Sequence, residues 1–156
     1  MKDRVILHVD VNNAFLSWSA VWLLKNGYKV DIRNRFAVIG GDEKKRKGVV
    51  LAKSIPAKQM GIVTGESLYS AKKKCPNLEV FPPNFKIYSY FSNKMFAYLQ
   101  KYSDKIERYS IDECFIDYTD SVKLFGDPLD IAYKIKNDIK EILGFTVNVG
   151  VGNNKL

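Results

Sequence analysis

Apolar positions along the chain recur with two different periods, and each change of period marks the start of a strand or a helix. Residues 5–11, VILHVDV, form a β-branched apolar run that is typical of a buried strand. From residue 14 to 27 the apolar side chains recur at helical spacing. Asn12 or Asn13 suits the N-cap of this helix, and Gly27 suits its C-cap.

Shorter elements are predicted next. Residues 36–41 and 48–54 predict the two strands of a hairpin, and the charged run 42–47 predicts its tip. The pattern then predicts a short helix over residues 55–60, a basic helix over 66–76 and a strand over 78–83.

The second half of the chain predicts two long helices and three strands. Phe91, Met95, Tyr98 and Leu99 recur at helical spacing and indicate a helix over residues 84–102. The remaining elements are strands over 105–110 and 114–119, an amphipathic helix over 128–144 and a strand over 145–152. Trp18 and Trp22, one helical turn apart, are predicted core residues.

This mixed order indicates an α+β fold, in which a sheet carries helices on one face. The 156 residues suffice for one domain with a real core. A closing helix is expected after the last strand, so the sequence predicts a truncated chain.

Composition narrows the class of partner. The apolar fraction of 46% is that of an ordinary globular protein, and the formal charge of +8 favours a polyanionic partner such as nucleic acid or an anionic membrane. A basic protein that binds neither is the alternative. Cys75, Cys114 and His8 do not have the spacing of a zinc site or a disulfide framework. The start lacks a signal peptide and no apolar run could span a bilayer, so a cytosolic location is expected.

Two adjacent acids interrupt an apolar, strand-forming run at residues 110–117, SIDECFID. Because an unpaired buried carboxylate is costly, Asp112 and Glu113 lie either at a solvated turn or beside something positive. Asp10 ends another buried strand, and carboxylates at the ends of neighbouring strands can converge. Three such groups repel one another unless cations neutralise them. The spacing also fits a hairpin turn at the acid pair and a helix cap at Asp10.

Converging carboxylates would suit hard divalent cations such as Mg²⁺. Two such ions, roughly 3.5–4 Å apart, can clamp the attacking and leaving oxygens of a phosphoryl transfer. Lys58 and Lys155 could each meet a phosphate, although most lysines are simply solvated. Residues 71–74, AKKK, are expected to form a solvated face or a loose nucleic-acid contact. Phe15 could pack in the core or form the floor of a nucleotide pocket.

Taken together, these segments resemble the N-terminal palm-and-fingers part of the Y-family (DinB/UmuC-type, translesion) DNA polymerases. The similar segments run in order along nearly the whole chain: ILHVDVNNAF, GVVLAKSIPAKQMGI, CPNLEVFPPNFKIYSYFSNKM, KYSDKIERYSIDECFIDYT and VNVGVGNNKL. The resemblance implies a template-directed DNA polymerase that joins dNTPs to a primer 3′-hydroxyl by two-metal nucleotidyl transfer.

The resemblance also implies roles for single residues. Asp10, Asp112 and Glu113 would be the catalytic, metal-binding carboxylates, with the backbone carbonyl of Val11 completing a shell of two Mg²⁺ ions, which Mn²⁺ can replace. The nucleotide would be bound by the amides of Asn13 and Ala14, by Phe15 as a steric gate against ribonucleotides, and by Lys58 and Lys155.

The family resemblance predicts a palm at about residues 1–25 and 80–156 and a small fingers subdomain at about 26–79. The thumb and little-finger domains would be absent, so the chain alone should polymerise poorly or not at all. Expected partners are primer-template DNA, dNTPs and a sliding clamp bound through the missing C-terminal part, in the cytoplasm or at a bacterial nucleoid. Ile55 and Lys58 stand where the family usually has Tyr and Arg, and Asn12 replaces a frequent Asp.

Two alternatives remain open. IGGDEKK, residues 39–45, superficially resembles the signature of diguanylate-type nucleotide cyclases, although Lys44 stands where that signature has an aromatic residue. In a hairpin, the same glycines would simply form the tip. The other alternative is a non-catalytic nucleic-acid-binding module.

Overall fold

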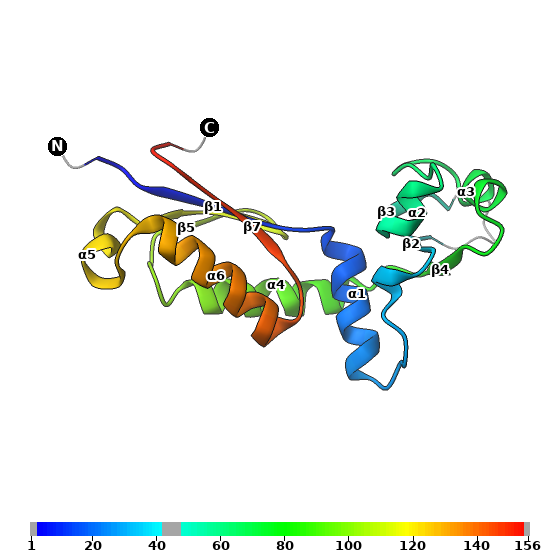
Figure 1. The fold of residues 1–156 in the computed structure, drawn as a ribbon, viewed down its shortest axis with the longest axis horizontal. Helices are drawn as coiled ribbons and strands as arrows, with labels where there is room; N and C mark the ends of the chain where they lie inside the picture. The colour runs from blue at the N-terminus through cyan, green and yellow to red at the C-terminus, as the bar shows by residue number, and fades with distance from the viewer. Residues whose placement is uncertain (1–2, 42–47, 155–156) are drawn as a thin grey trace. The chain divides into compact units, whose positions relative to one another are not determined.

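The computed structural model describes residues 3–41 and 48–154, so the predicted loop tip at 42–47 and Lys155 lie outside the described residues. The chain divides into two compact units (Figure 1). Unit 1 comprises Met1–Asn12 and Ser89–Leu156, and unit 2 comprises Asn13–Tyr88.

Unit 1 is built on a four-stranded antiparallel sheet with the strand order β5-β6-β1-β7. Its strands are β1 (Ile6–Val11), β5 (Ile106–Ser110), β6 (Glu113–Asp117) and β7 (Val147–Gly152). The first and last strands of the chain are therefore neighbours, because β1 pairs with both β6 and β7.

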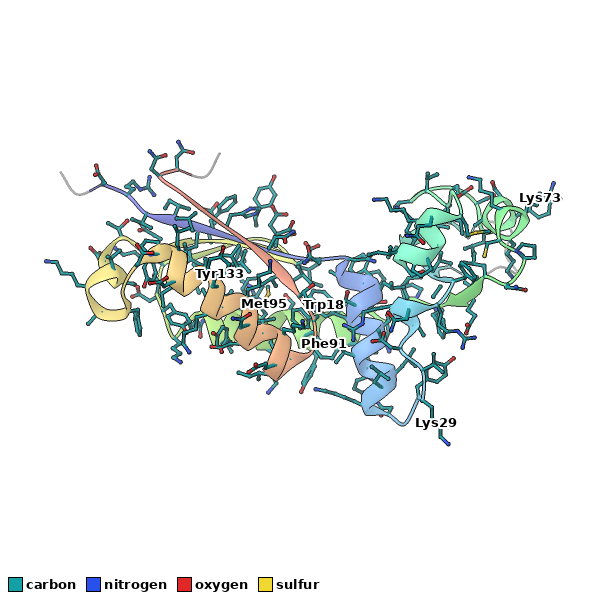
Figure 2. The ribbon with its side chains drawn as sticks, in the orientation of Figure 1. Trp18, Lys29, Lys73, Phe91, Met95 and Tyr133 are labelled. Atoms are coloured by element: carbon teal, nitrogen blue, oxygen red, sulfur yellow. The ribbon has the colours of Figure 1, made fainter. Side chains whose placement is uncertain are left out.

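One face of this sheet is packed against helices. The helices of unit 1 are α4 (Phe85–Leu99, whose first turn belongs to unit 2), α5 (Val122–Phe125) and α6 (Pro128–Leu143), with a 3₁₀ turn η3 (Thr119–Ser121) before α5. Buried side chains of α4 and α6 contribute to the core, whereas α5 has no buried residue. Phe91 and Met95 of α4, labelled in Figure 2, are fully buried. Leu7 and Val9 of β1 are fully buried as well. His8, between those two strand residues, is only half-buried. From Leu7 to Val11, alternation along β1 thus places the apolar side chains on the face packed against helices and the polar ones on the opposite face.

Unit 2 contains a smaller, three-stranded sheet with the order β3-β2-β4. Its elements are α1 (Ala14–Lys25), the 3₁₀ turn η1 (Ile32–Asn34), β2 (Ala37–Gly40), β3 (Val50–Lys53), α2 (Ile55–Gln59), α3 (Leu68–Lys74) and β4 (Glu79–Phe81). Strands β2 and β3 form the predicted antiparallel hairpin, and β4 runs parallel to β2.

Both faces of the smaller sheet are covered. Ala37 and Ile39 pack in a cluster with Leu16 of α1, whereas Val38 packs in a second cluster with Leu68 of α3. This two-sided burial explains why every residue of β2 is buried. It also explains why α1 belongs to unit 2.

The structure confirms the predicted α+β class and the predicted series of strands and long helices, and it adds details that the sequence did not predict. The strands form two sheets, and only the larger one has an open face. The short segment formed by η3 and α5 was not predicted. Trp18 is fully buried as expected, but the prediction for Trp22 was wrong, because its side chain is 40% exposed. Among the described helices, none has the length and apolar character needed to cross a membrane.

The boundaries of the two units differ from the predicted division at about residues 25 and 80. The chain passes between units at Asn12/Asn13 and again at Tyr88/Ser89. The assignment of unit 1 as palm and unit 2 as fingers stays a prediction.

Candidate metal centre

The pairing of β1 with β6 brings Asp10 and Glu113 together. The two residues are directly opposite in the antiparallel register, so their side chains lie on the same face of the sheet. Asp112 immediately precedes β6, and its carbonyl accepts a hydrogen bond from the Val11 amide at 2.9 Å. This bond fixes the backbone of Asp112 beside the end of β1.

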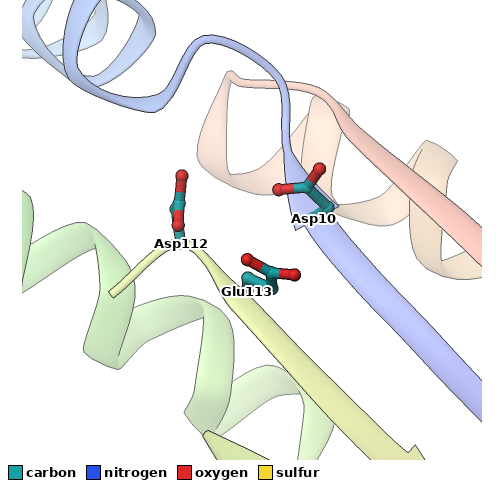
Figure 3. A group of neighbouring side chains, drawn as sticks. All are labelled: Asp10, Asp112 and Glu113. Atoms are coloured by element: carbon teal, nitrogen blue, oxygen red, sulfur yellow. The ribbon is translucent and has the colours of Figure 1, made fainter. Parts of the chain in front are cut away.

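The three carboxylates converge on one point. Each of Asp10, Asp112 and Glu113 offers an oxygen, and these oxygens lie within 4.8 Å of one another. Figure 3 shows the three side chains gathered where β1 ends and β6 begins. All three are half-buried. The predicted convergence of residues from opposite ends of the chain is therefore present.

The electrostatics of this cluster favour a bound cation. Partial burial raises the pKa of Asp10 above its usual value, and the neighbouring charges of Asp112 and Glu113 raise it further, against a smaller opposing effect of His8. Negative charges packed this closely destabilise one another until a positive ion neutralises them. Carboxylate oxygens are also the ligands that hard divalent cations prefer. The residues present thus fit a divalent metal ion.

Two further residues, which sequence reasoning missed, make hydrogen-bond contacts with the acids. Ser110 donates from Oγ to Oδ1 of Asp112 at 2.7 Å and lies 3.4 Å from Oε2 of Glu113. His8 lies with Nε2 2.8 Å from Oε1 of Glu113. The signal was in the sequence, because His8 is two residues before Asp10 and strand alternation puts both on one face.

An open hollow of about 630 Å³ lies on the same side of the sheet as the acids. Its lining includes His8, Glu113 and Phe115 in the middle of the sheet, with Tyr109 on β5 and Gly150 on β7. The face of unit 1 that carries the three acids is therefore accessible from solvent within this unit.

The first turn of α1 carries three predicted nucleotide-binding residues, all in unit 2. Asn13 is at the N-cap position but does not cap the helix with its side chain, which donates instead to the Lys53 carbonyl at 2.6 Å. Its backbone is left-handed, with a φ of 49°. Ala14 begins the helix, and the first amides of any helix lack intrahelical acceptors.

Phe15 is half-buried among aromatic rings. It stacks on Tyr88 with a centroid distance of 4.8 Å and meets the edge of Phe85 at 5.8 Å. On α2, Lys58 is exposed and Ile55 is 67% exposed. The nucleotide-binding roles of these residues, and that of Lys155, stay predictions.

Three carboxylates gathered where β1 ends and β6 begins, in an α+β fold, define the class of proteins with a candidate divalent-metal site for phosphoryl transfer. The family model described as "impB/mucB/samB family" matches residues 9–156, and the chain belongs to this family. The resemblance to Y-family polymerases is thereby confirmed.

Named relatives agree with this assignment. The chain is 58% identical to DNA polymerase IV of Clostridium acetobutylicum over 154 residues. This aligned region covers 99% of this chain and 39% of the relative. A solved Y-family DNA polymerase chimera of Dbh and Dpo4 matches 97% of this chain and 43% of its own, with a TM-score of 0.85 and 31% identity. The insertion ternary complex of Dbh DNA polymerase matches the same shares, with a TM-score of 0.84 and 29% identity. The chain thus spans about two fifths of the length of these relatives.

The comparisons do not support the cyclase alternative. The structure gives the first glycine of the IGGDEKK segment a packing role instead, because a Cβ added to Gly40 would lie 2.7 Å from Cδ2 of Leu68. The remainder of the segment, from residue 42 on, lies outside the described residues.

Proposed function

We propose that this chain carries the catalytic portion of a template-directed DNA polymerase of the translesion type, which transfers nucleotides from dNTPs to a primer 3′-hydroxyl. The observation that carries the proposal is the convergence of Asp10, Asp112 and Glu113 within 4.8 Å, in a chain that belongs to the impB/mucB/samB family. Relatives that carry the name DNA polymerase IV support the same activity.

The metal ions in this proposal are two Mg²⁺ ions, which Mn²⁺ can replace. Asp10, Asp112 and Glu113 would hold them with their carboxylates, and Val11 with its backbone carbonyl. When bound, such a pair of ions supplies charge stabilisation to both the attacking and the leaving oxygen of the transfer. The acids of this chain would position the ions, and the hydrogen bonds from Ser110 and His8 hold two of those acids in place.

Residues of unit 2, together with Lys155 of unit 1, would bind the incoming nucleotide. The amides at Asn13 and Ala14 would donate to phosphate oxygens, as helix N-termini commonly do. Lys58 and Lys155 would add positive charge near the phosphates. Phe15 would exclude a ribose 2′-hydroxyl, since the aromatic rings packed around it hold its own ring in place.

The partners in this proposal are primer-template DNA and dNTPs. The formal charge of +8 supports a polyanionic partner. A relative solved as an insertion ternary complex also agrees with such substrates. A sliding clamp as processivity partner, and a location in the cytoplasm or at the nucleoid, stay predictions.

A chimera tests the proposal directly. This chain replaces the 154 matching residues of the Clostridium DNA polymerase IV, and primer extension is measured with dNTPs and Mg²⁺. Metal-dependent extension by the chimera, and its loss in the D112N chimera, are the expected results. A folded chimera that binds primer-template but extends no primer would contradict the proposal.

A further inference from the structure

We propose that His8 is a positioning residue that holds Glu113 in the orientation needed to bind metal, an inference that rests on the proposed function of the carboxylate cluster. Nothing in the acids themselves fixes Glu113, whose long side chain is 27% exposed and is repelled by the two neighbouring aspartates. The structure supplies one short hydrogen bond to it, from Nε2 of His8 to Oε1 at 2.8 Å.

The ring of His8 is itself held in place. In the register of β1 with β6, His8 is opposite Phe115, and the two rings stack with centroids 4.7 Å apart and an interplanar angle of 22°. Phe115 in turn meets the edge of Tyr109 at 6.0 Å. On the other side, His8 is paired with Gly150, which has no side chain. The imidazole therefore packs toward β6, where Nε2 reaches Glu113 two residues before Phe115.

The direction of the hydrogen bond follows from the chemistry of the partners. An ionised carboxylate can only accept, so Nε2 must carry the hydrogen. Ser110 has a single hydroxyl hydrogen, and its short bond is to Asp112 at 2.7 Å, against 3.4 Å to Glu113. The two orienting residues are thus divided between the acids: Ser110 holds Asp112, and His8 holds Glu113 by Oε1.

This arrangement matches the way carboxylate ligands are supported in metal sites. Hydrogen bonds from outside the ligand shell orient the ligands, and their loss typically costs about 10–100-fold in metal affinity or activity. His8 is half-exposed, so we expect an effect near the lower end of that range, about tenfold.

Three variants of this chain test the role of His8. H8F keeps an aromatic ring to stack on Phe115 but has no N–H, whereas H8Q keeps a donor. Y109F is the matched control, because it also removes one polar group from an aromatic ring in the same hollow. Binding of Mn²⁺ is titrated by electron paramagnetic resonance without nucleotide, and thermal melting is recorded in parallel.

The expected result is about tenfold weaker Mn²⁺ binding in H8F, with affinities close to wild type in H8Q and Y109F. Equal Mn²⁺ affinity in folded H8F and wild type would overturn the proposed role of His8 but not the proposed metal centre. A wild-type chain that binds no Mn²⁺ would overturn the proposed metal centre itself. The two failures are therefore distinguishable.

A second measurement needs no variant. His8 is the single histidine of the sequence, so a long-range ¹H–¹⁵N spectrum of the metal-free chain reports this ring alone. Hydrogen on Nε2 is expected. A ring protonated only on Nδ1 could not donate to Glu113, and that result would refute the proposal even if H8F failed to fold.

Discussion

Asp112 illustrates how much one residue in this cluster depends on its neighbours. Its backbone is held by the Val11 amide and its carboxylate by Ser110, and two other carboxylates lie within 4.8 Å. Without a cation such an arrangement is electrostatically unfavourable, so metal affinity is the property most sensitive to losing one of the acids.

We predict that Asp112→Ala weakens Mg²⁺ or Mn²⁺ binding at least about tenfold, since a direct ligand should matter no less than its supporting hydrogen bond. Isothermal titration with and without dNTP measures the effect. Asp104→Asn is the control, because Asp104 is an exposed acid of unit 1 outside the cluster. Equal metal affinity in wild type and D112A would count against the site.

Phe15 carries the second prediction at this scale. In the chimera with the Clostridium relative, Phe15→Ala should increase ribonucleotide incorporation, because the ring that would block the 2′-hydroxyl is gone. Tyr88→Phe is the control, since it keeps the stacked ring next to Phe15. The ratio of dNTP to rNTP incorporation is the measurement, and an unchanged ratio in F15A would refute the gate.

At the scale of elements, α3 is joined to the loop before it by one carboxylate. Glu66 accepts hydrogen bonds from the Val63 amide, the Ser70 hydroxyl and Lys74, while Lys74 also donates to the Gly61 carbonyl. The Lys74 bond, followed by the Val63 amide, lowers the pKa of Glu66 from 4.5 to about 2. An acid whose pKa is lower in the folded state than in the unfolded state stabilises the fold at pH values above the unfolded pKa. This stabilisation is lost as the pH falls toward the folded pKa.

We therefore predict that Glu66→Gln lowers the free energy of unfolding by about 2 kcal/mol at neutral pH. The difference from wild type should shrink as pH falls from 4.5 to about 2, and denaturant unfolding at a series of pH values measures it. Glu79→Gln is the control, because its partner Arg35 is half-exposed and such pairs contribute less than about 1 kcal/mol. A difference that stays constant down to pH 2 would show that Glu66 is not the titrating group.

At the scale of the whole molecule, the positive net charge and the acid cluster predict two properties that can be tested separately: attraction to DNA and metal-dependent nucleotide binding. In the proposed function, attraction to DNA phosphates would come from the basic surplus, whereas metal-dependent nucleotide binding would require the three acids. A non-catalytic nucleic-acid-binding module would have only the first property.

The triple variant D10N/D112N/E113Q separates these properties. Loss of three negative charges takes the formal charge from +8 to +11, so salt-dependent binding of primer-template DNA should persist or strengthen. Metal-dependent dNTP binding should disappear. Fluorescence anisotropy at several salt concentrations measures both ligands. The control D104N/D130N/E141Q makes the same charge change with exposed acids outside the cluster, and it should retain metal-dependent dNTP binding.

Local patterns were sufficient to predict most elements. The helical spacing of Phe91, Met95 and Leu99 predicted α4 because buried residues on one helix face must recur every three or four positions, and these three residues are buried. Trp22 shows the limit of that rule. Helical spacing places Trp22 on the same face of α1 as Trp18. The width of the buried face, however, depends on which elements pack against the helix, and Trp22 is 40% exposed.

By itself, the sequence determined most of the secondary structure, the family, and the three candidate acids, because these depend on local periodicity and on motifs of contiguous residues. Only the tertiary structure decided that the strands divide into two sheets, that α1 packs with the smaller one, and that His8 and Ser110 lie within hydrogen-bond distance of the acids. The physical reason is that strand partners and cross-strand contacts join residues far apart in the chain, such as His8 and Glu113, and their register is set by packing of the whole sheet.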